Sequence, residues 1–496
     1  MGNLERDVVI GAAIYLVFLL GLGYLGRRAR REDTISDHFL AGRGIGFFVL
    51  LLTLFATQYS GNSLSGFPGR TYREGLPYVM CVTFMVGIVA GYLLFAPQLF
   101  SIARRFRFVT PTDFLRQRYD SRWLQRISVA IFVFVLTNFL LAQLKAMGNA
   151  FSGLTGQEHH YVWAIVIGAA VILIYELLGG MRAVAWTDAL QGVLLMAGLL
   201  ILAILLSTEI GTPAEVIRKI AAQSPQKAAA PDGRTCMTWI SYFLLLGLGA
   251  PLYPQAIQRI YAARTSRELR RALGIMSFLP LVAITTVVYI GLAGIALDPD
   301  HSRAESDRIT FIVLSTLVEM QPAAYLPTLV VMLGVLAAIM STADSCLLSL
   351  TSILSHDVFG SRRVPGGDAS TRGVAWISFA VMGILAAIAL DRSVTLWQLL
   401  TVKFEVLIQL SPAFVLGCWH HRDDPRGVKT VDVVRGLFVG LLVGVGLFLT
   451  KKAWGQGGTY YGMHAGTLGV IVNYTVVVIS WRLRVGSMRE AKGAEA

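Results

Sequence analysis

The chain has 496 residues, of which 55% are hydrophobic and only 15% are charged, and its formal net charge is +13. Soluble domains carry about 25% charged residues, so the composition excludes a soluble globular protein. Arginine and lysine fall in short segments between apolar runs, as they do in the cytoplasmic loops of membrane proteins. We therefore expect a multi-pass protein with the lipid bilayer as its surroundings, and no nucleic-acid partner.

Apolar runs of about 20 residues, the length that crosses the hydrocarbon core of a bilayer, predict thirteen membrane spans. The first run is kept as a span because the residues before it lack the basic segment and cleavage site of a signal peptide. In chain order, the predicted spans 1 to 13 cover about 8–26, 45–70, 76–101, 127–149, 161–179, 184–207, 236–258, 272–297, 325–354, 373–391, 394–418, 433–451 and 465–482.

The loops between these spans alternate in charge. Cations gather in every second loop, as in 27–31, 104–126 and 264–271, whereas the opposite loops include the acidic stretch 298–307. Because Lys and Arg are enriched in cytoplasmic loops, we expect the N-terminus outside, the C-terminus in the cytoplasm, and a location in the cell (plasma or inner) membrane. The long outer loops, 208–235 and 298–324, could hold short surface helices such as AEVIRKIAAQ.

Two spans are interrupted by residues that weaken a helix. Span 2 contains ATQYSGNSLSGFPG at 56–69, and span 7 contains four Gly and Pro residues within 247–254. Proline removes a backbone donor, and glycine destabilises a helical turn. The two spans are five apart, so spans 2–6 and 7–11 can form inverted repeats, a pattern that points to a transporter's central site. Alternatively, these residues mark kinks or tight helix packing.

Six segments together resemble the sodium/solute symporter family, the relatives of sodium-coupled sugar, proline and pantothenate transporters. They are GRGIGFF (42–48), ATQYSGNSLSGFPGRTYREG (56–75), FVTPTDFLRQRY (108–119), GGMRAVAWTDALQG (179–192), PQAIQRIYAARTSRELRRA (254–272) and AAIMSTADSCLLSLTSILSHDVF (337–359). The resemblance implies an all-α membrane protein with a LeuT-type 5+5 core in spans 2–11, one extra helix before it and two after. The expected units are 1–44, the first repeat 45–207, the outer loop 208–235, the second repeat 236–418, and 419–496.

A sodium site is implied by the same resemblance. Ala338, Ser341 and Thr342 in span 9 are spaced i, i+3, i+4 and share one helix face. Neutral oxygens there could bind Na⁺ loosely enough to release it. The resemblance implies as ligands the backbone oxygens of Ala56, Tyr59 and Ala338 with the hydroxyls of Ser341 and Thr342. Alternatively, the hydroxyls bond to their own helix or join neighbouring helices.

Some members of the family bind a second sodium between the Asp of the WTD motif, here Asp188, and hydroxyls of span 9. The chain keeps Asp188, Ser341 and Ser345 but has Asp344 where a hydroxyl would be needed. The added carboxylate could strengthen a second cation site or make it a proton-carrying one. Alternatively, Asp188 caps the cytoplasmic start of span 6.

Polar residues of the interrupted part of span 2 are the predicted solute contacts, namely Gln58, Ser60, Asn62 and Ser63. The resemblance places a substrate- or ion-contacting residue two positions after the alanine ligand, which is Gln58. The proline branch of the family has Asp at that position, so this residue disfavours proline as the solute.

Lys145, Lys403 and Glu405 lie inside predicted spans, where burying a charge costs about 3 kcal/mol or more. Lys145 could contact the solute or extend to the outer surface. Lys403 and Glu405 are two residues apart and point about 160° away from each other on a helix, so each needs its own partner. Lys403 could bind the carboxylate of an anionic solute or form a salt bridge within the bundle.

The sequence predicts a sodium-coupled symporter that imports a small carboxylate-bearing solute, such as a monocarboxylate, pantothenate or an amino acid, by alternating access. Tyr253, in the interrupted part of span 7, is either an inner gate or a packed aromatic residue. The alternatives are a proton-coupled symporter of the same fold, with Asp344 or Glu405 as carrier, and a passive facilitator. Common hydrolase motifs are absent, so we expect no enzyme activity, and no obligate protein partner is evident.

Overall fold

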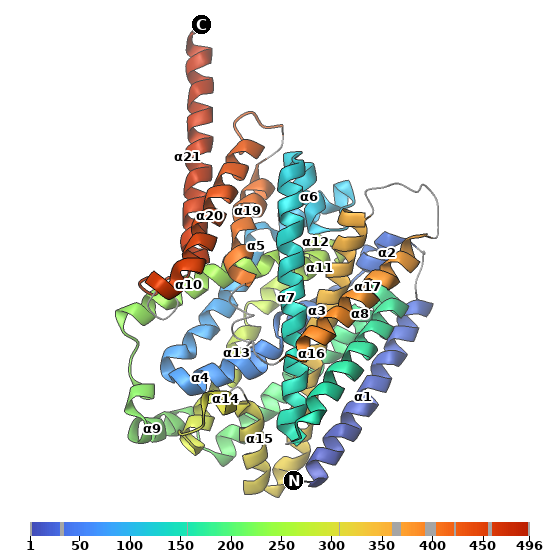
Figure 1. The fold of residues 1–496 in the computed structure, drawn as a ribbon, viewed down its shortest axis with the longest axis vertical. Helices are drawn as coiled ribbons and strands as arrows, with labels where there is room; N and C mark the ends of the chain where they lie inside the picture. The colour runs from blue at the N-terminus through green and yellow to red at the C-terminus, as the bar shows by residue number, and fades with distance from the viewer. Residues whose placement is uncertain are drawn as a thin grey trace.

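The computed structural model describes residues 2–29, 34–155, 157–306, 308–359, 369–391, 403–420, 423–454 and 459–494 (Figure 1). Within these ranges the chain folds into helices, and the β-contacts are two isolated bridges, Ile45 with Ala263 and Tyr460 with Met463. The all-α prediction is therefore confirmed for the described part of the chain.

Most predicted spans correspond to one long helix each. These helices are α1 (Gly2–Arg28), α5 (Met80–Phe106), α7 (Arg122–Thr155), α13 (Leu279–Leu297), α16 (Tyr325–Ile353), α17 (Ala369–Ala389), α20 (Thr430–Trp454) and α21 (Ala465–Ala494). Among the described residues, nine helices are long and apolar enough to cross a membrane, or ten with the bent pair of span 2. The number thirteen is not established, because α8 (His159–Glu209) contains both spans 5 and 6, and the first part of span 11 lies outside the described residues.

Gly180 divides the 51-residue helix α8 at the predicted junction of spans 5 and 6. Its backbone has φ 55° and ψ −148°, a conformation that side chains rarely adopt. A Cβ at this position would lie 2.5 Å from the His38 carbonyl oxygen, so the close approach of α2 (Ile35–Leu40) also requires glycine. The two halves of α8 can therefore have different directions although both are helical.

Span 2 is broken, as predicted. Helix α3 (Phe47–Gln58) ends within the interrupted segment and is followed by the π-helical turn η2 (Asn62–Gly66) and by α4 (Phe67–Glu74). The two helical parts are bent by 55°.

Span 7 is broken in the same way. Helix α10 (Gly233–Gly249) is followed by η5 (Ala250–Leu252), by Tyr253 with ψ 128°, and then by α11 (Pro254–Ala262). Pro251 and Pro254 lie at the start of η5 and α11, where a missing amide donor costs least.

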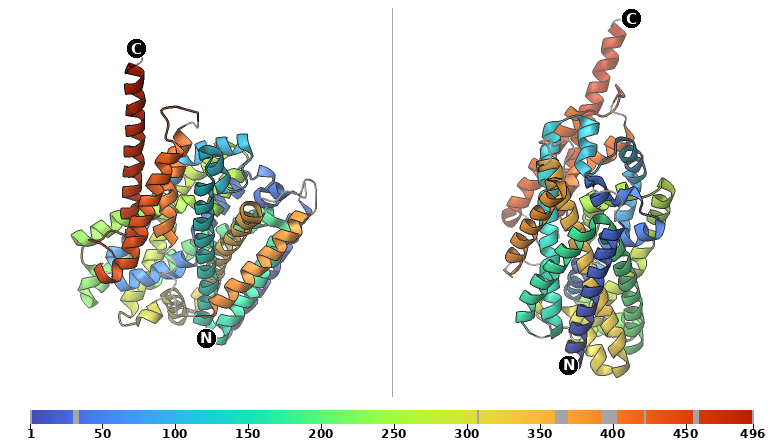
Figure 2. Two further views of the ribbon diagram at one scale, coloured as in Figure 1. Left: turned by 45° about the horizontal axis from the view of Figure 1, so that its top comes forward. Right: turned by 90° about the vertical axis from the view of Figure 1, so that its right-hand side faces the viewer.

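Short helices cover the two ends of the bundle. Helices α9 (Pro213–Gln223), α14 (Arg303–Ser306) and α15 (Ile309–Met320) lie at the end where the chain begins, and α9 confirms the predicted loop helix. At the opposite end lie α2 and α6 (Pro111–Tyr119), and α21 projects beyond the bundle there (Figures 1 and 2). The remaining segments are α12 (Ser266–Met276), α19 (Ser411–Trp419), η1 (Ala41–Arg43), η3 (Leu76–Val79), η4 (Pro225–Ala228), η6 (Pro322–Ala324), η7 (Leu354–Phe359) and η8 (Ile408–Leu410).

Candidate ion and solute site

The break in span 2 frees two backbone oxygens. In a continuous α-helix the Ser60 amide would donate to the Ala56 carbonyl, but it donates to Ser63 Oγ at 3.3 Å. The Ser63 amide donates to the Ser60 carbonyl and not to that of Tyr59. Two of the predicted sodium ligands, the carbonyls of Ala56 and Tyr59, therefore lack their helical donors.

Thr342 of α16 faces this break. Its Oγ1 lies 3.3 Å from the Tyr59 carbonyl oxygen and 3.2 Å from that of Ala338. A hard cation such as Ca²⁺ lies about 2.4 Å from its oxygen ligands, so two ligands at a right angle are about 3.4 Å apart. Na⁺ has a similar size. The Thr342 hydroxyl hydrogen-bonds to both carbonyls, one of them in its own helix, which is also what the alternative expects. The two distances match the spacing of neighbouring ligands around a cation, and Tyr59, Ala338 and Thr342 are all buried.

Ser341 is held beside Thr342 by Asp188. The Ser341 Oγ donates to Asp188 Oδ1 at 2.7 Å, and both side chains are fully buried. A hydroxyl that donates its proton to a carboxylate keeps its lone pairs for a cation. Asp188 therefore orients a predicted sodium ligand in the way that residues behind a metal's direct ligands do.

Asp188 also forms a fully buried ion pair with Arg259 of α11. Arg259 Nη2 lies 2.5 Å from Asp188 Oδ2, and the exposed fraction of both side chains is 0%. The same nitrogen donates to Ser345 Oγ at 2.5 Å, and Arg259 Nε donates to Thr53 Oγ1 at 2.7 Å. Thr53 in turn donates to Asp188. This network joins α3, α8, α11 and α16, and Asp188 interacts with side chains there instead of capping a helix.

The residues predicted for a second cation lie together, but a cationic side chain is among them. Arg259 Nη2 donates to both Asp188 Oδ2 and Ser345 Oγ at 2.5 Å. Asp344 borders this group, because its Oδ1 accepts a hydrogen bond from Ser345 at 3.1 Å, and its Oδ2 accepts one from the Tyr175 hydroxyl at 2.5 Å. A guanidinium thus takes the position beside Asp188 where a second sodium was predicted.

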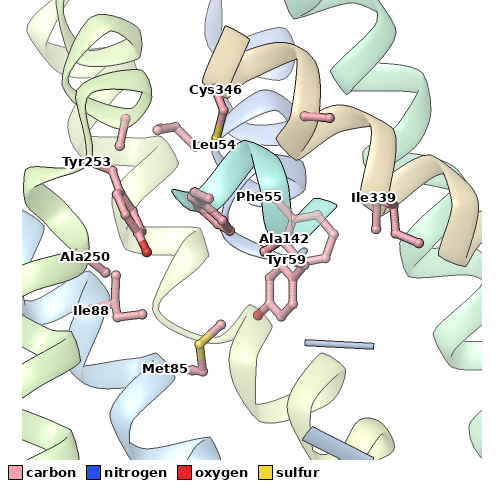
Figure 3. Packing of buried hydrophobic residues seen from close by; sticks show 14 of the residues in the cluster. Leu54, Phe55, Tyr59, Met85, Ile88, Ala142, Ala250, Tyr253, Ile339 and Cys346 are labelled. Atoms are coloured by element: carbon pink, nitrogen blue, oxygen red, sulfur yellow. The ribbon is translucent and has the colours of Figure 1, made fainter. Parts of the chain in front are cut away.

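A cavity of about 40 Å³ lies between the two broken spans. It is lined by residues of spans 2, 3, 4, 7 and 11: Leu54, Thr57, Gln58, Ser60, Ser63, Phe67, Met85, Ile88, Tyr92, Phe139, Leu246, Ala250, Tyr253, Ala256 and Phe404. Figure 3 shows Tyr253, Ile88 and Met85 around this space. An apolar lining with a few polar groups is typical of small-molecule sites.

The structure brings three of the four predicted solute contacts, Gln58, Ser60 and Ser63, to this cavity, and the Asn62 side chain lies outside the described part of the structure. Gln58 Nε2 donates to the Met85 carbonyl at 3.3 Å, and its Oε1 is buried without a hydrogen-bond partner. The wall also includes Tyr253, whose ring stacks on Phe139 with centroids 5.0 Å apart.

Lys403 and Glu405 have separate surroundings, as their helical spacing predicts. The Lys403 Nζ is 3.0 Å from the centroid of the Phe139 ring, is fully buried, and has no hydrogen-bond partner. The rings of Tyr253 and Phe404 are 5.3 and 5.6 Å away. The Glu405 carboxylate accepts a hydrogen bond from the amide of Gly466, at the start of α21, where the helix dipole favours an anion.

Lys145, which was a predicted solute contact, does not line the cavity. Its Nζ donates to the Asp391 carbonyl oxygen beyond the end of α17, and the side chain is buried. The contact joins span 4 to span 10 and accounts for the burial of this lysine without a solute.

Three residues of this region were missed by sequence reasoning. Arg259 lies in the segment PQAIQRIYAARTSRELRRA (254–272), but no sequence pattern identifies Asp188 as its partner. Gln143 of α7 accepts the amide of Gly61 at 2.9 Å and so supports the break in span 2. Glu176 is an acid inside an apolar run of span 5, which is the same signal that singled out Lys403, and it could have been found.

Two adjacent broken helices and a shared cavity are typical of secondary transporters. The family model "Sodium:solute symporter family" matches residues 38–424, and the chain belongs to this family. Membership supports Na⁺ as the coupling ion and a multi-pass membrane location.

Curated relatives are transporters. The osmoregulated proline transporter OpuE of Bacillus subtilis is 27% identical over 448 residues, covering 89% of each chain. The high-affinity proline transporter PutP of the same organism is 30% identical over 348 residues, covering 69% of this chain and 72% of PutP.

Solved structures show the same fold. A Na⁺-coupled sialic acid symporter in a substrate-bound outward-open state matches with a TM-score of 0.76 at 17% identity, covering 97% of both chains. A nucleobase-cation-symport-1 family transporter in a closed conformation matches with a TM-score of 0.57 at 14% identity, covering 94% of this chain and 96% of that one. The all-helical fold is therefore that of LeuT-type transporters.

Proposed function

We propose that the protein is a symporter that uses the sodium gradient to import a small carboxylate-bearing solute. The observation that carries this proposal is the contact of Thr342 Oγ1 with the carbonyl of Tyr59, which joins the break of span 2 to span 9. Na⁺ binds there between the carbonyls of Ala56, Tyr59 and Ala338 and the hydroxyls of Ser341 and Thr342.

Coupling follows from the position of the break. Thr57, Gln58 and Ser60 line the cavity and alternate along the chain with the ion ligands Ala56 and Tyr59. Sodium binding therefore fixes the backbone that also contacts the solute. A membrane potential of 100 mV contributes about 2.3 kcal/mol for each charge moved, which supports roughly fifty-fold accumulation.

The environment of Lys403 supports an anionic solute. Cation–π contacts with exposed aromatic rings contribute about 0.5–1 kcal/mol and reach about 2 kcal/mol when desolvated, whereas a buried charge without a counter-ion costs several kcal/mol. All three rings around its Nζ, those of Phe139, Tyr253 and Phe404, line the cavity. A carboxylate that enters the cavity reaches the ammonium when one ring rotates aside, and it neutralises this charge.

The loop charges predict that the N-terminus lies outside. On that orientation the Arg259–Asp188 network lies in the inner half of the bundle, because α3 and α11 are the cytoplasmic parts of spans 2 and 7. Opening to the cytoplasm requires these helices to move away from α8 and α16. Tyr253, at the break above α11, is the proposed inner gate.

Radiolabelled uptake into proteoliposomes tests the function. With an inward sodium gradient, we expect accumulation of at least one of a panel of monocarboxylates, pantothenate and amino acids including proline, and no accumulation when choline replaces sodium. Uptake that is unaffected by choline would indicate a facilitator, and uptake driven by a proton gradient alone would indicate proton coupling. Either result would contradict the proposal.

Lys403→Met is expected to abolish accumulation of the carboxylate solute without lowering thermal stability, because methionine removes an unneutralised buried charge at similar volume. Lys145→Met is the matched control, since Lys145 does not line the cavity. This variant should still accumulate the solute. Unchanged uptake by Lys403→Met, measured in the same proteoliposomes, would exclude Lys403 as the counter-charge.

A further inference from the structure

A second cavity, of about 420 Å³, lies beside α6, between the last residues of α5 and those of α19. Its described lining shares no residue with the cavity between the broken spans. The apolar span that contains α5 ends at Phe106, which is part of the wall. Helix α6 lies at the end of the bundle that the loop charges predict to be cytoplasmic (Figure 1). The cavity is therefore separate from the ion and solute site and lies where a span leaves the bilayer.

One wall of this cavity is held in place by Arg118 of α6. This arginine is buried, and its Nε donates to the carbonyl oxygens of Gly417 and His420 at 3.1 and 2.8 Å. Its Nη2 donates to the Val428 carbonyl oxygen at 2.9 Å. These bonds fix the end of α19 against α6, so the cavity is built into the fold and carries a permanent positive charge.

Arg105, the second arginine of the wall, is exposed, so a ligand can reach it. Its guanidinium lies 5.3 Å from the centroid of the Phe106 ring, and within the described part of the chain it forms no ion pair with a carboxylate. Of the described residues that line the cavity, Asp423 is the one acid, and it is exposed. The two arginines outnumber this acid, so the wall favours an anion.

The face of α5 that carries Arg105 continues into an apolar surface. Leu94, Ser101 and Arg105 are spaced i, i+7, i+11, so they share one face of the helix. Leu94 is 42% exposed, and Trp419 of α19, which is 60% exposed, donates its indole N–H to the Leu94 carbonyl oxygen at 2.7 Å. Tryptophan is enriched where a membrane meets water. An apolar strip therefore leads along α5 from the predicted hydrocarbon region to the basic cavity.

We propose that this cavity binds the phosphate group of an anionic phospholipid from the inner leaflet. The planar guanidinium of Arg105 donates two N–H groups to the phosphate, and an acyl chain lies along Leu94 and Trp419. Basic pockets between membrane helices on the cytoplasmic side are suited to such headgroups. A soluble phosphate has the same headgroup chemistry but leaves the apolar strip uncovered, whereas a lipid occupies both parts. The bound lipid joins span 3 to span 11.

Native mass spectrometry of the purified full-length protein tests this proposal, with phosphatidylglycerol or phosphatidylcholine added at equal concentration. We expect the wild type to bind phosphatidylglycerol at least about 10-fold more tightly, because a hydrogen bond to a charged group is worth about that factor. Arg105→Gln should lose this preference. Arg270→Gln, which changes an exposed arginine of α12 in another loop predicted to be cytoplasmic, is the matched control and should keep it.

Arg105→Lys keeps the positive charge, so its preference for phosphatidylglycerol should exceed that of Arg105→Gln. Size-exclusion elution verifies that each variant is folded. Equal binding of the two lipids by the wild type, or an unchanged preference in Arg105→Gln, would overturn the proposal. Displacement of phosphatidylglycerol by inorganic phosphate at millimolar concentration would also overturn it, because the cavity would then be a site for a soluble anion.

Discussion

Replacing Ser341 and Thr342 together by alanine is expected to raise the sodium concentration for half-maximal solute uptake by at least about 100-fold. The change removes two of the five proposed ligand oxygens, and altering residues behind a metal's direct ligands already weakens binding by about 10- to 100-fold. The measurement is initial uptake in proteoliposomes at a series of sodium concentrations with constant ionic strength.

Thr328→Ala provides the control for this prediction. Thr328 is a buried threonine on the same helix, and its hydroxyl has no hydrogen-bond partner. The control should keep the wild-type dependence on sodium. If the double variant also keeps it, sodium does not bind between α3 and α16.

Arg259→Met is expected to destabilise the protein by about 3–5 kcal/mol, because it leaves the Asp188 carboxylate buried without its counter-charge. Thr53 and Ser341 still donate to Asp188 but carry no charge. The measurement is the apparent melting temperature of the purified protein, together with the yield of folded protein.

Combining Arg259→Met with Asp188→Asn should restore a substantial part of the lost stability. Asparagine is neutral and can still accept a hydrogen bond from Ser341 or Thr53, so no uncompensated charge remains. The stability of Arg259→Lys should lie between those of the wild type and Arg259→Met. Lysine keeps the charge but lacks the guanidinium nitrogens that contact Asp188, Ser345 and Thr53 at once. A double variant less stable than either single variant would show that the pair does not act through charge balance.

The broken spans could be predicted because their causes are local. Pro251 and Pro254 remove backbone donors wherever the chain places them, and the Ser60 amide finds its alternative acceptor three residues away in Ser63. The spacing of Ala338 and Thr342 likewise needs only helix geometry, and the structure places the Thr342 hydroxyl within hydrogen-bond distance of the carbonyls of both Ala338 and Tyr59.

Contacts between distant segments could not be predicted in the same way. Asp188 and Arg259 are 71 residues apart, and only the packing of both α8 and α11 against α16 makes them a pair. The ring of Phe139 lies over the Lys403 ammonium because span 4 crosses span 11 there. The second-cation prediction treated Asp188 as free for an ion, since its guanidinium partner depends on tertiary packing.

The exact number of helices is not confirmed by the structure. Hydropathy separates spans 5 and 6 by a few residues, and the structure separates the two helical halves of α8 at a single non-helical residue, Gly180. That residue can be recognised as a break only when the approach of His38 is known. Local hydropathy indicates which residues contact lipid, whereas the continuity of a helix depends on its backbone angles.

The most direct test of the ion site is a high-resolution cryo-electron microscopy structure determined in sodium and again in choline. In sodium, the account predicts density about 2.4 Å from the carbonyl oxygens of Ala56, Tyr59 and Ala338 and from the hydroxyls of Ser341 and Thr342, as for a hard cation of this size. In choline this density should be absent. Sodium density elsewhere only, or α3 and α16 too far apart to share an ion in every state, would contradict the account.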